Sequence, residues 1–394
     1  MTNVFHESEQ IAIRCVLMRA GTSKGVYLLE QDIPAPGPLR DTVLKRIMGT
    51  PDVMQIDGLG GTHLITSKIA IVGRSDRADA DVEYTFAQTD IDKDVIDYEC
   101  NCGNISTGVG PFAIDAGLVA VNNGITMVRI HNTNTDKIMY AHVPVVNGRA
   151  AVLGNFAIAG VPGSGAEIFL DYKDTVGAYS GRALPTGNVI DNVELEDGRS
   201  IEATICDSAS INIFVRAEDL GLSGDEGPNE VNNNSALINV IREIRGKVGV
   251  KLGICSSWKT VDDESPMIPL LVFVAPPGDY VALNGSEVKR SESDLRARFI
   301  FMNRCHEAMA GAGSICISTA SRIVGSIINQ MLPQGAQDTN EVRIAHPLGV
   351  MIVRVKCKPS ATDVSLKFEQ LGFARTARRI MDGFVYVPRD IFDR

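Results

Sequence analysis

The sequence predicts a mixed α/β protein with two domains, and three observations carry this prediction. The chain has 394 residues, 44% of them hydrophobic, which is enough for a large core and for two domains of ordinary size. Strand-like and helix-like apolar stretches alternate along the whole chain, without tandem repeats or low-complexity tracts. Two runs rich in small residues, 103–110 and 310–314, each lead into an apolar helical stretch, so the two halves share one feature.

The first half is predicted to begin with a hairpin, whose polar tip lies at 19–25 between two apolar strands. A glycine-rich turn then precedes a strand that Lys68 interrupts with a charge. The predicted elements, in order, are a strand at 11–18, a strand at 26–29, a helix at 40–48 begun by Asp41 and stopped by Gly49, a turn at 56–63, a strand at 64–72 and a helix at 111–119.

The second half is predicted to begin after the turn at 184–188, which is a suitable point for the chain to cross between domains. An earlier turn lies at 160–166. The predicted elements that follow are strands at 201–207, 211–216 and 269–275, and helices at 235–246, 296–309 and 310–320.

Cys102 is predicted to lie at a helix start, where a thiol is reactive. Free backbone N–H groups and the positive end of the helix dipole favour a carboxylate ligand and a thiolate there. Small residues at 103, 106–108 and 110 let a substrate approach the main chain closely. These features indicate an active-site loop. A packed structural cysteine is the alternative for Cys102, and it is our interpretation of Cys100.

Lys68 is the second candidate, because the apolar neighbours 69–72 predict a strand that is buried on both faces. Burying an ammonium group is costly, and a buried lysine can act as a general base or acid. The alternative is a lysine whose stem packs while its ammonium group reaches water, which is the usual arrangement.

The composition argues against nucleic-acid and membrane partners. A formal net charge of -10 disfavours nonspecific nucleic-acid binding, although it allows a local basic pocket for a small anion. No apolar run approaches the roughly 20 residues needed to span a bilayer, and the polar start does not resemble an export signal. A cytoplasmic location is therefore expected. The sequence is compatible with a homo-oligomer.

Neither a metal nor a cofactor is expected. The pair Cys100 and Cys102 has no second closely spaced Cys/His pair, and zinc ligands are usually spaced more widely. Eight cysteines without an export signal also argue against a disulfide framework. The glycine spacing fits neither a dinucleotide fingerprint nor a P-loop.

Two helix N-termini facing each other across a cleft would suit a substrate with two carboxylates. When a proton moves next to a carboxylate, backbone amides stabilise the developing enolate while side chains carry the proton. Such an arrangement would suit proton transfer beside a carboxylate and would require no cofactor.

The chain resembles the PrpF family within the diaminopimelate epimerase-like fold, nearly end to end. The combination of matching stretches is specific, although each alone is weak. These are Arg19–Gly25, Gln55–Gly61, Thr66–Lys68, Asn101–Asn104, His131–Thr135, Gly160–Gly163, Leu184–Asn188, Val274–Pro277, a helix around His306, His346–Pro347 and Arg375–Arg379.

The resemblance implies two similar domains, each a mixed β-sheet wrapped around a central helix, with the active site between them. We place the first domain at 1–187 and the second at 188–377, and expect 378–394 to return to the first. It also implies a cofactor-independent isomerase that shifts a C=C bond in an unsaturated di- or tricarboxylate by 1,3-allylic proton transfer. Lys68 matches the catalytic lysine of the family, and Cys102 matches its active-site cysteine.

A mechanism follows in which Lys68 moves the allylic proton while Cys102 assists or positions the substrate. A single base would transfer the proton on one face of the substrate, and transfer on opposite faces would require two bases. The residues expected to bind the carboxylates are Thr22, Ser23, Gly103 and Asn104, with Gln55, Met309, Gly311 and Ser314 from across the cleft.

The sequence favours a dicarboxylate within the family. Members resembling 2-methylaconitate isomerase tend to have a lysine where this chain has 269–271, and a serine where it has Phe301. Losing a cation and a hydroxyl disfavours a third carboxylate. The expected substrate is 3-methylitaconate, then 2-methylaconitate or aconitate. The alternatives are tautomerisation of 4-oxalomesaconate, and a two-base racemase or epimerase, which the missing second thiol disfavours.

The remaining polar residues are interpreted as structural. His306 and His346 have no metal-spaced partner, so hydrogen-bonded structural roles are expected. Arg375, Arg378 and Arg379 are expected to form ion pairs on a solvated helical face at the domain junction.

Overall fold

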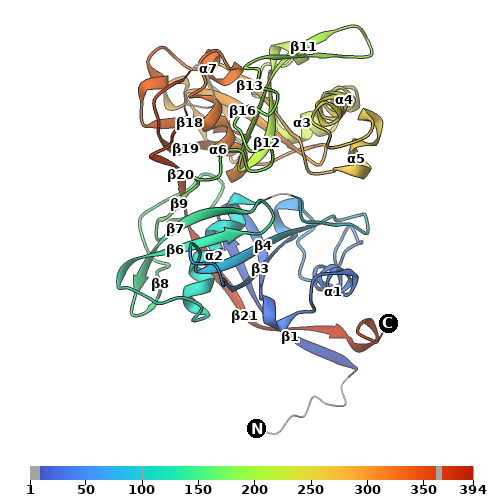
Figure 1. Ribbon diagram of the computed structural model, residues 1–394, viewed down its shortest axis with the longest axis vertical. Helices are drawn as coiled ribbons and strands as arrows, with labels where there is room; N and C mark the ends of the chain where they lie inside the picture. Colours follow the sequence, from blue (N-terminus) through green and yellow to red (C-terminus); the bar gives the residue numbers. More distant parts are fainter. Residues whose placement is uncertain (1–8, 100, 361–365, 394) are drawn as a thin grey trace.

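The computed structural model describes residues 9–99, 101–360 and 366–393, so Cys100 lies outside the described residues. The chain forms two lobes stacked along the long axis of the molecule (Figure 1). The first lobe contains the N-terminal half, and the last strand of the chain runs back into it (Figure 1). The boundaries 187/188 and 377/378 stay a prediction.

The first lobe is a mixed sheet with a helix on each side. Its elements are β1 (Gln10–Ala20), β2 (Ser23–Leu29), α1 (Pro38–Met48), β3 (Lys68–Arg74), β4 (Val82–Thr89), β5 (Ile96–Asp97), α2 (Gly103–Asp115), β6 (Gly124–Asn132), β7 (Lys137–Val146), β8 (Arg149–Ala150) and β9 (Ile168–Asp171).

The second lobe follows a similar plan and the chain then returns to the first lobe. Its elements are β10 (Asp191–Glu194), β11 (Ser200–Ser208), β12 (Ser210–Arg216), α3 (Pro228–Asn232), α4 (Ser235–Lys251), α5 (Val261–Glu264), β13 (Leu270–Ala275), β14 (Tyr280–Val281), β15 (Glu287–Val288), β16 (Leu295–Phe301), β17 (Arg304–Cys305), α6 (Gly311–Ala320), α7 (Ile327–Met331), β18 (Glu341–His346), β19 (Gly349–Lys356), β20 (Gln370–Arg375) and β21 (Ala377–Pro388).

The strand order of the two lobes is the same. In the first lobe β2 pairs with β3 in parallel, β3 with β4 antiparallel and β4 with β6 in parallel. In the second lobe β12, β13, β16 and β18 repeat this sequence of parallel, antiparallel and parallel pairs. By this correspondence α6 is the counterpart of α2, and each begins at a glycine. The two halves of the chain, which share a small-residue run, therefore also share their strand topology.

Each sheet wraps around one apolar helix. Strands β1, β2, β3, β6 and β7 contact α2, and strands β11, β12, β19 and β20 contact α6. Small residues allow this close packing. A side chain at Gly108 would meet the Tyr27 hydroxyl at 2.3 Å, and one at Gly110 would meet Val143 at 2.8 Å. The small residues of α2 thus serve the core as well as the loop that precedes it.

The lobes are linked by two strands from the C-terminal part of the chain. β20 pairs with β19 of the second lobe and with β9 of the first. β21 then pairs with β1 along its length, from Ala20 with Ala377 to Gln10 with Pro388. Residues just before and after this crossing are therefore held at the junction between the lobes.

Two expectations about secondary structure are wrong. Residues 296–309 contain strand β16, strand β17 and irregular segments instead of a helix, because Arg296 to Ile300 pair antiparallel with β13. His306 consequently follows a strand. Lys68 does not interrupt a strand but is the first residue of β3, because Leu64–Thr66 forms a short 3-10 helix before it. The Thr66 backbone N–H closes that turn by donating to His63 O at 3.0 Å.

Other bounds shift by a few residues. The helix expected at 40–48 begins at Pro38 and ends before Gly49, which has a left-handed φ of 79°. The helix expected at 111–119 begins at Gly103 and continues through Pro111. Cys102 is its N-cap, as predicted.

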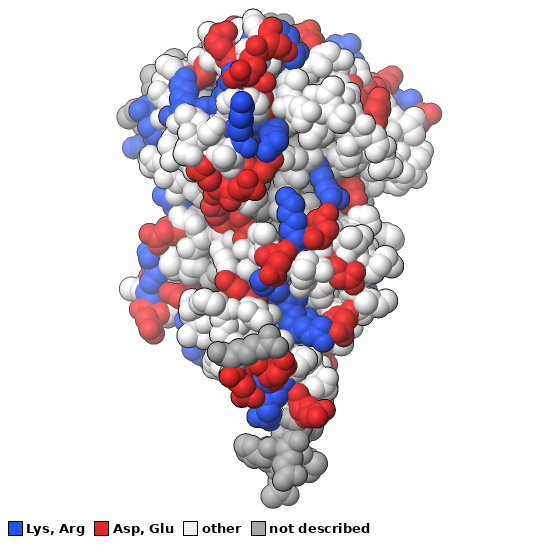
Figure 2. All heavy atoms as spheres, turned by 90° about the vertical axis from the view of Figure 1, so that its right-hand side faces the viewer, with Lys and Arg blue, Asp and Glu red and all other residues white. Residues whose placement is uncertain are grey.

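Two further features concern the surface and the helices. On the face drawn in Figure 2, acidic and basic side chains are interspersed in small mixed groups. Among the described residues no helix is long and apolar enough to cross a membrane. The cytoplasmic location and the homo-oligomer stay predictions.

Candidate active site

The N-termini of α2 and α6 meet at the junction between the lobes. A side chain at Gly103 would lie 2.8 Å from the Gly311 Cα atom, and one at Gly311 would lie 2.8 Å from the Gly103 Cα atom. Only glycines allow the two helix starts to approach this closely. The positive ends of two helix dipoles therefore converge, which is unfavourable in isolation and favourable for an anion between them.

Cys102 lies immediately before this contact. It is partly buried, and its carbonyl accepts from the Ser106 backbone N–H at 2.8 Å. Its thiol is free. Burial raises the pKa of Tyr27, and the nearby Cys102 raises that pKa further. The thiol thus lies at the helix start with a buried tyrosine close by.

Lys68 is buried, with 4% of its surface exposed, on the first residue of β3. Its Nζ donates to Gln88 Oε1 at 3.0 Å and lies over the rings of Phe86 at 5.2 Å and Phe301 at 5.3 Å. No carboxylate pairs with Lys68 in the described part of the chain. Because Phe301 belongs to β16, the amine lies where the second lobe meets the first.

Gln88 fixes the direction of this hydrogen bond. Its Nε2 donates to the carbonyls of Ser67 at 2.9 Å, Thr89 at 3.0 Å and Leu64 at 3.3 Å. The side-chain oxygen must therefore face Lys68 as an acceptor. A buried amine held by one neutral acceptor can exchange a proton with a bound molecule.

Gly25 brings Lys68 and the start of α2 together. It pairs with Lys68 in the parallel register of β2 and β3. A side chain there would meet Lys68 O at 2.8 Å and Ile105 Cδ1 at 2.9 Å. The lysine strand and the first turn of α2 thus both pack closely against this one glycine.

Thr22, Ser23 and Asn104 form one cluster at the tip of the first hairpin. Asn104 Nδ2 donates to Thr22 Oγ1 at 3.1 Å, and Asn104 Oδ1 accepts from the Thr22 backbone N–H at 3.4 Å. The Ser23 hydroxyl is buried without a hydrogen-bond partner in the described structure. This unsatisfied hydroxyl is available to a ligand.

Gln55 lies beside Ser67, the residue before Lys68. Its Oε1 accepts from the Thr62 backbone N–H and from the Ser67 hydroxyl, both at 2.8 Å. Its Nε2 is buried and has no partner among the described groups. Gln55 therefore has a buried donor without a partner, next to the residue that precedes Lys68.

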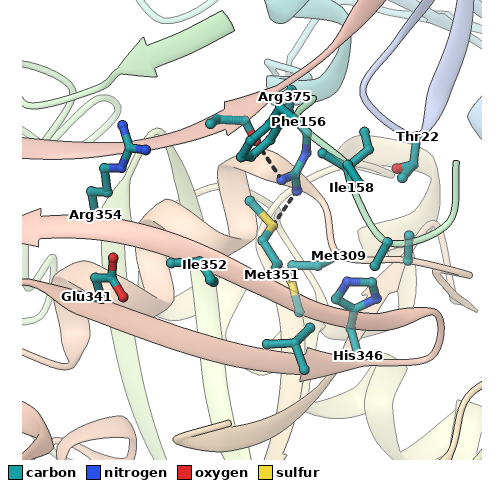
Figure 3. A pocket seen from close by; sticks show the side chains of 15 residues that line it. Thr22, Phe156, Ile158, Met309, Glu341, His346, Met351, Ile352, Arg354 and Arg375 are labelled. Carbon is teal, nitrogen blue, oxygen red and sulfur yellow. Dashed lines mark hydrogen bonds between the residues drawn. The ribbon is translucent and has the colours of Figure 1, made fainter. Parts of the chain in front are cut away.

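The three candidate residues of the second lobe, Met309, Gly311 and Ser314, do not all lie at the junction. Met309 lines a cavity of about 190 Å³ between the lobes, and Thr22 lines the same cavity (Figure 3). The Ser314 hydroxyl is fully buried and donates to Gly311 O at 2.8 Å. The structure thus brings Met309 and Gly311 to the junction, whereas Ser314 is used within its own helix.

His306 is a further residue at Lys68. Its Nδ1 accepts from the Ala308 backbone N–H at 3.0 Å, and its ring packs edge-on against Phe299. Burial, with the nearby Lys68 charge, lowers the pKa of His306 to about 4. The imidazole is therefore neutral at pH 7.

We expect this histidine to make stability fall as the medium becomes acidic. The folded pKa of about 4 lies below the unfolded value of 6.5, so the contribution is complete above pH 6.5 and is lost as pH falls towards 4. The loss should be about 2 kcal/mol at pH 5 relative to pH 7. Urea unfolding of wild type and His306→Gln at both pH values measures it. An equal pH dependence in the two proteins would contradict this assignment.

Arg375 is the residue that the sequence interpretation misplaced. It was expected in an ion pair on a solvated helical face, yet it ends strand β20 and is 6% exposed. Burial lowers the pKa of Arg375 to about 10, so it stays charged at neutral pH. Arg379 does form ion pairs, with Asp115 and Asp382. An apolar strand pattern ending in arginine at 370–375 was the available signal.

A second thiol is missing from the counterpart helix. Ala310 is the N-cap of α6, in the position that Cys102 has at α2. Cys316 lies inside α6, fully buried, and its thiol donates to Cys206 O at 3.2 Å. Among the described residues no group of three or more His, Cys, Asp or Glu side chains is arranged to hold a metal.

Comparison with curated proteins gives full-length relatives. The chain is 46% identical over 383 residues to the 3-methylitaconate isomerase of Eubacterium barkeri, covering 97% of this chain and 99% of that protein. It is 37% identical to the 2-methyl-aconitate isomerase of Cupriavidus necator, covering 97% and 99%, and 37% identical to the 4-oxalomesaconate tautomerase of Pseudomonas putida, covering 97% and 98%.

Solved structures confirm the epimerase-like fold. The crystal structure of a methylitaconate-delta-isomerase matches with a TM-score of 0.79 and 46% identity, over 98% of this chain and 97% of that one. A hydroxyproline epimerase from Agrobacterium vitis matches with a TM-score of 0.57 at 11% identity, over 96% and 93%, and shares the fold. The family model described as PrpF protein matches residues 10–388. The chain therefore belongs to the PrpF family.

Proposed function

We propose that this protein is a cofactor-independent isomerase that converts 3-methylitaconate to 2,3-dimethylmaleate by a 1,3-allylic proton transfer. The observation that carries the proposal is the buried amine of Lys68, held by Gln88 on a strand that packs with the first turn of α2, whose N-terminus converges with that of α6. Full-length similarity to a 3-methylitaconate isomerase supports it. The reaction requires a group that carries the proton, which the amine supplies, and groups that bind the carboxylates, which the helix N-termini supply.

The reaction needs one proton to change carbon. The amine of Lys68 takes the hydrogen from the carbon that bears the methyl group, and the electrons of that C–H bond form the new internal double bond. The former methylene carbon receives the proton back from the ammonium group. Between the two steps the charge is spread over the allyl group and its carboxylate, where backbone N–H groups of α2 and α6 would stabilise it.

The choice of a dicarboxylate is supported by the residues around Lys68. Phe301 presents its ring to the amine, and Leu270, the first residue of β13, is buried and apolar. Leu270 corresponds to Lys68 in the repeated topology, so the second lobe adds no cation at that position. A third carboxylate would lie against apolar groups there, which is unfavourable.

Proton NMR with a panel of acids tests the proposal. The purified protein is incubated separately with 3-methylitaconate, the aconitates, 2-methylaconitate and 4-oxalomesaconate. We expect the fastest conversion with 3-methylitaconate. Preferred conversion of 4-oxalomesaconate would instead favour the tautomerase, and absence of any conversion would contradict the proposed function.

Cys102 should matter less than Lys68. Cys102→Ser keeps the N-cap and a small polar group, so we expect kcat to fall by about 10- to 100-fold if the thiol assists proton transfer. Cys102→Ala should show a similar loss. Cys357→Ser is the matched control, because Cys357 is also partly buried but lies after β19, away from the helix start. Unchanged kcat in both Cys102 variants would leave Cys102 a positioning residue only.

A further inference from the structure

Arg375 is a buried cation without a carboxylate partner in the described part of the chain. Its Nε donates to Asn104 Oδ1 at 3.4 Å and its Nη1 to Ala374 O at 3.1 Å, while Nη2 contacts the sulfur of Met351. Its guanidinium group stacks on Phe373 at 4.9 Å. A long bond, a neighbouring carbonyl and a thioether are weak compensation for a buried charge.

The guanidinium group has donors to spare. These contacts engage one N–H on each nitrogen, and an arginine carries five N–H groups. Buried charges in proteins are normally paired, because removing an ion from water is costly. An unpaired arginine with free donors therefore indicates an anionic ligand.

The cavity next to Arg375 gives such a ligand its place. It has a volume of about 190 Å³ and lies between the lobes, with Thr22 and His346 at one end (Figure 3). Arg354 and Glu341 lie at its other end (Figure 3). Arg354 is paired with Glu167, so Arg375 is the cation that remains for a ligand in this cavity.

His346 adds a neutral donor. Its Nδ1 accepts from the Leu348 backbone N–H at 3.2 Å, which places its proton on Nε2. Burial, together with Arg375, lowers the pKa of His346 well below its ordinary value. The ring can therefore donate one hydrogen bond without adding charge.

Hydrogen bonds connect residues that line the cavity with residues of the candidate active site. Asn104, the second residue of α2, bonds both Arg375 and Thr22. Ala308 lines the cavity and also bonds His306, beside Lys68. An anion at Arg375 would thus lie one side chain away from the start of α2.

We propose that Arg375 is a specificity-determining residue that binds one of the two substrate carboxylates in this cavity, while the N-termini of α2 and α6 bind the other. This inference rests on the proposed function for the identity of the substrate. It adds that the enzyme selects a diacid over its monoester through a guanidinium contact, which is geometrically suited to a carboxylate.

Two kinds of measurement test it. Steady-state kinetics with 3-methylitaconate gives kcat and KM, and calorimetry gives the Kd of methylsuccinate, a saturated diacid, and of its monomethyl esters. For Arg375→Met we expect KM and the diacid Kd to rise about 10- to 100-fold, with kcat changed less than about fivefold. Arg375→Lys should recover part of the diacid affinity. Wild type should bind the diacid at least about tenfold more tightly than one of the esters.

Arg298→Met is the matched control. Arg298 is equally buried, stacks on Tyr280 and donates to Glu226 O, yet it does not line this cavity. Its replacement should lower stability and leave the diacid Kd of the folded protein unchanged.

The outcomes separate this inference from the proposed function. An unchanged diacid Kd and KM in Arg375→Met would overturn the inference, while turnover by wild type would keep the proposed function. Absence of wild-type turnover would overturn the proposed function. If neither Arg375 variant folds, the comparison of diacid and ester Kd values in wild type still tests the inference. Equal binding of the diacid and both esters would overturn it.

Discussion

Lys68→Met should lower kcat for 3-methylitaconate by about 10³-fold or more while the protein stays folded. Loss of a general base or acid usually costs about 10²- to 10⁴-fold, and here one amine serves both carbons. Methionine retains most of the stem between Phe86 and Phe301, so the packing survives. Assays of turnover by NMR or ultraviolet absorbance measure kcat, and circular dichroism checks that the variant is folded.

Lys173→Met is the matched control for removing a lysine that lies over an aromatic ring. Lys173 lies over Tyr140 at 5.1 Å, after β9 and outside the cavity of Figure 3. Its loss should leave kcat within about twofold of wild type. A folded Lys68→Met protein with a normal rate would refute the role of Lys68, whatever the control shows.

Gly311→Ala should impair both stability and catalysis, because it forces the two helix starts apart. The added carbon would lie 2.6 Å from Phe373 Cζ and 2.8 Å from Gly103 Cα, and neither the ring nor the backbone can yield freely. Overpacking of this kind costs about 1–3 kcal/mol. A displacement near 1 Å at the site can lower the rate about 10²-fold.

Urea unfolding and steady-state kinetics measure the two effects of Gly311→Ala. Gly383→Ala is the control, because a side chain at that position in β21 would meet nothing within 4 Å. Its stability should stay within about 1 kcal/mol of wild type, and its kcat should not change. A Gly311→Ala protein with normal kcat would show that the close approach of α2 and α6 is not needed for catalysis.

The start of α2 could be predicted from sequence because its signals are local. Cys102 precedes a run of small residues, and such a run forms the first turn of each of the two central helices. The first hairpin was predictable for the same reason, since two apolar strands flank a short polar tip. The roles of Lys68 and Cys102 came from family resemblance, and both stay proposals.

The wrong predictions concern residues whose structure depends on distant partners. Residues 296–300 are strand because they pair with β13, more than twenty positions away, and no local signal reports that pairing. Arg375 looked like part of a charged helix, but pairing of β20 with β9 carries it into the junction. Gln88 was missed because its role requires three carbonyls from two segments.

Proton NMR of wild type with 3-methylitaconate in deuterated water follows the proton that Lys68 is proposed to move. We expect the vinyl signals to disappear as the methyl signal of 2,3-dimethylmaleate grows, with at most one deuterium per product molecule at early conversion. Lys68→Met should show neither change. Deuterium entering the methyl-bearing carbon of unreacted methylitaconate, without product, would contradict the account, because a racemase gives that result.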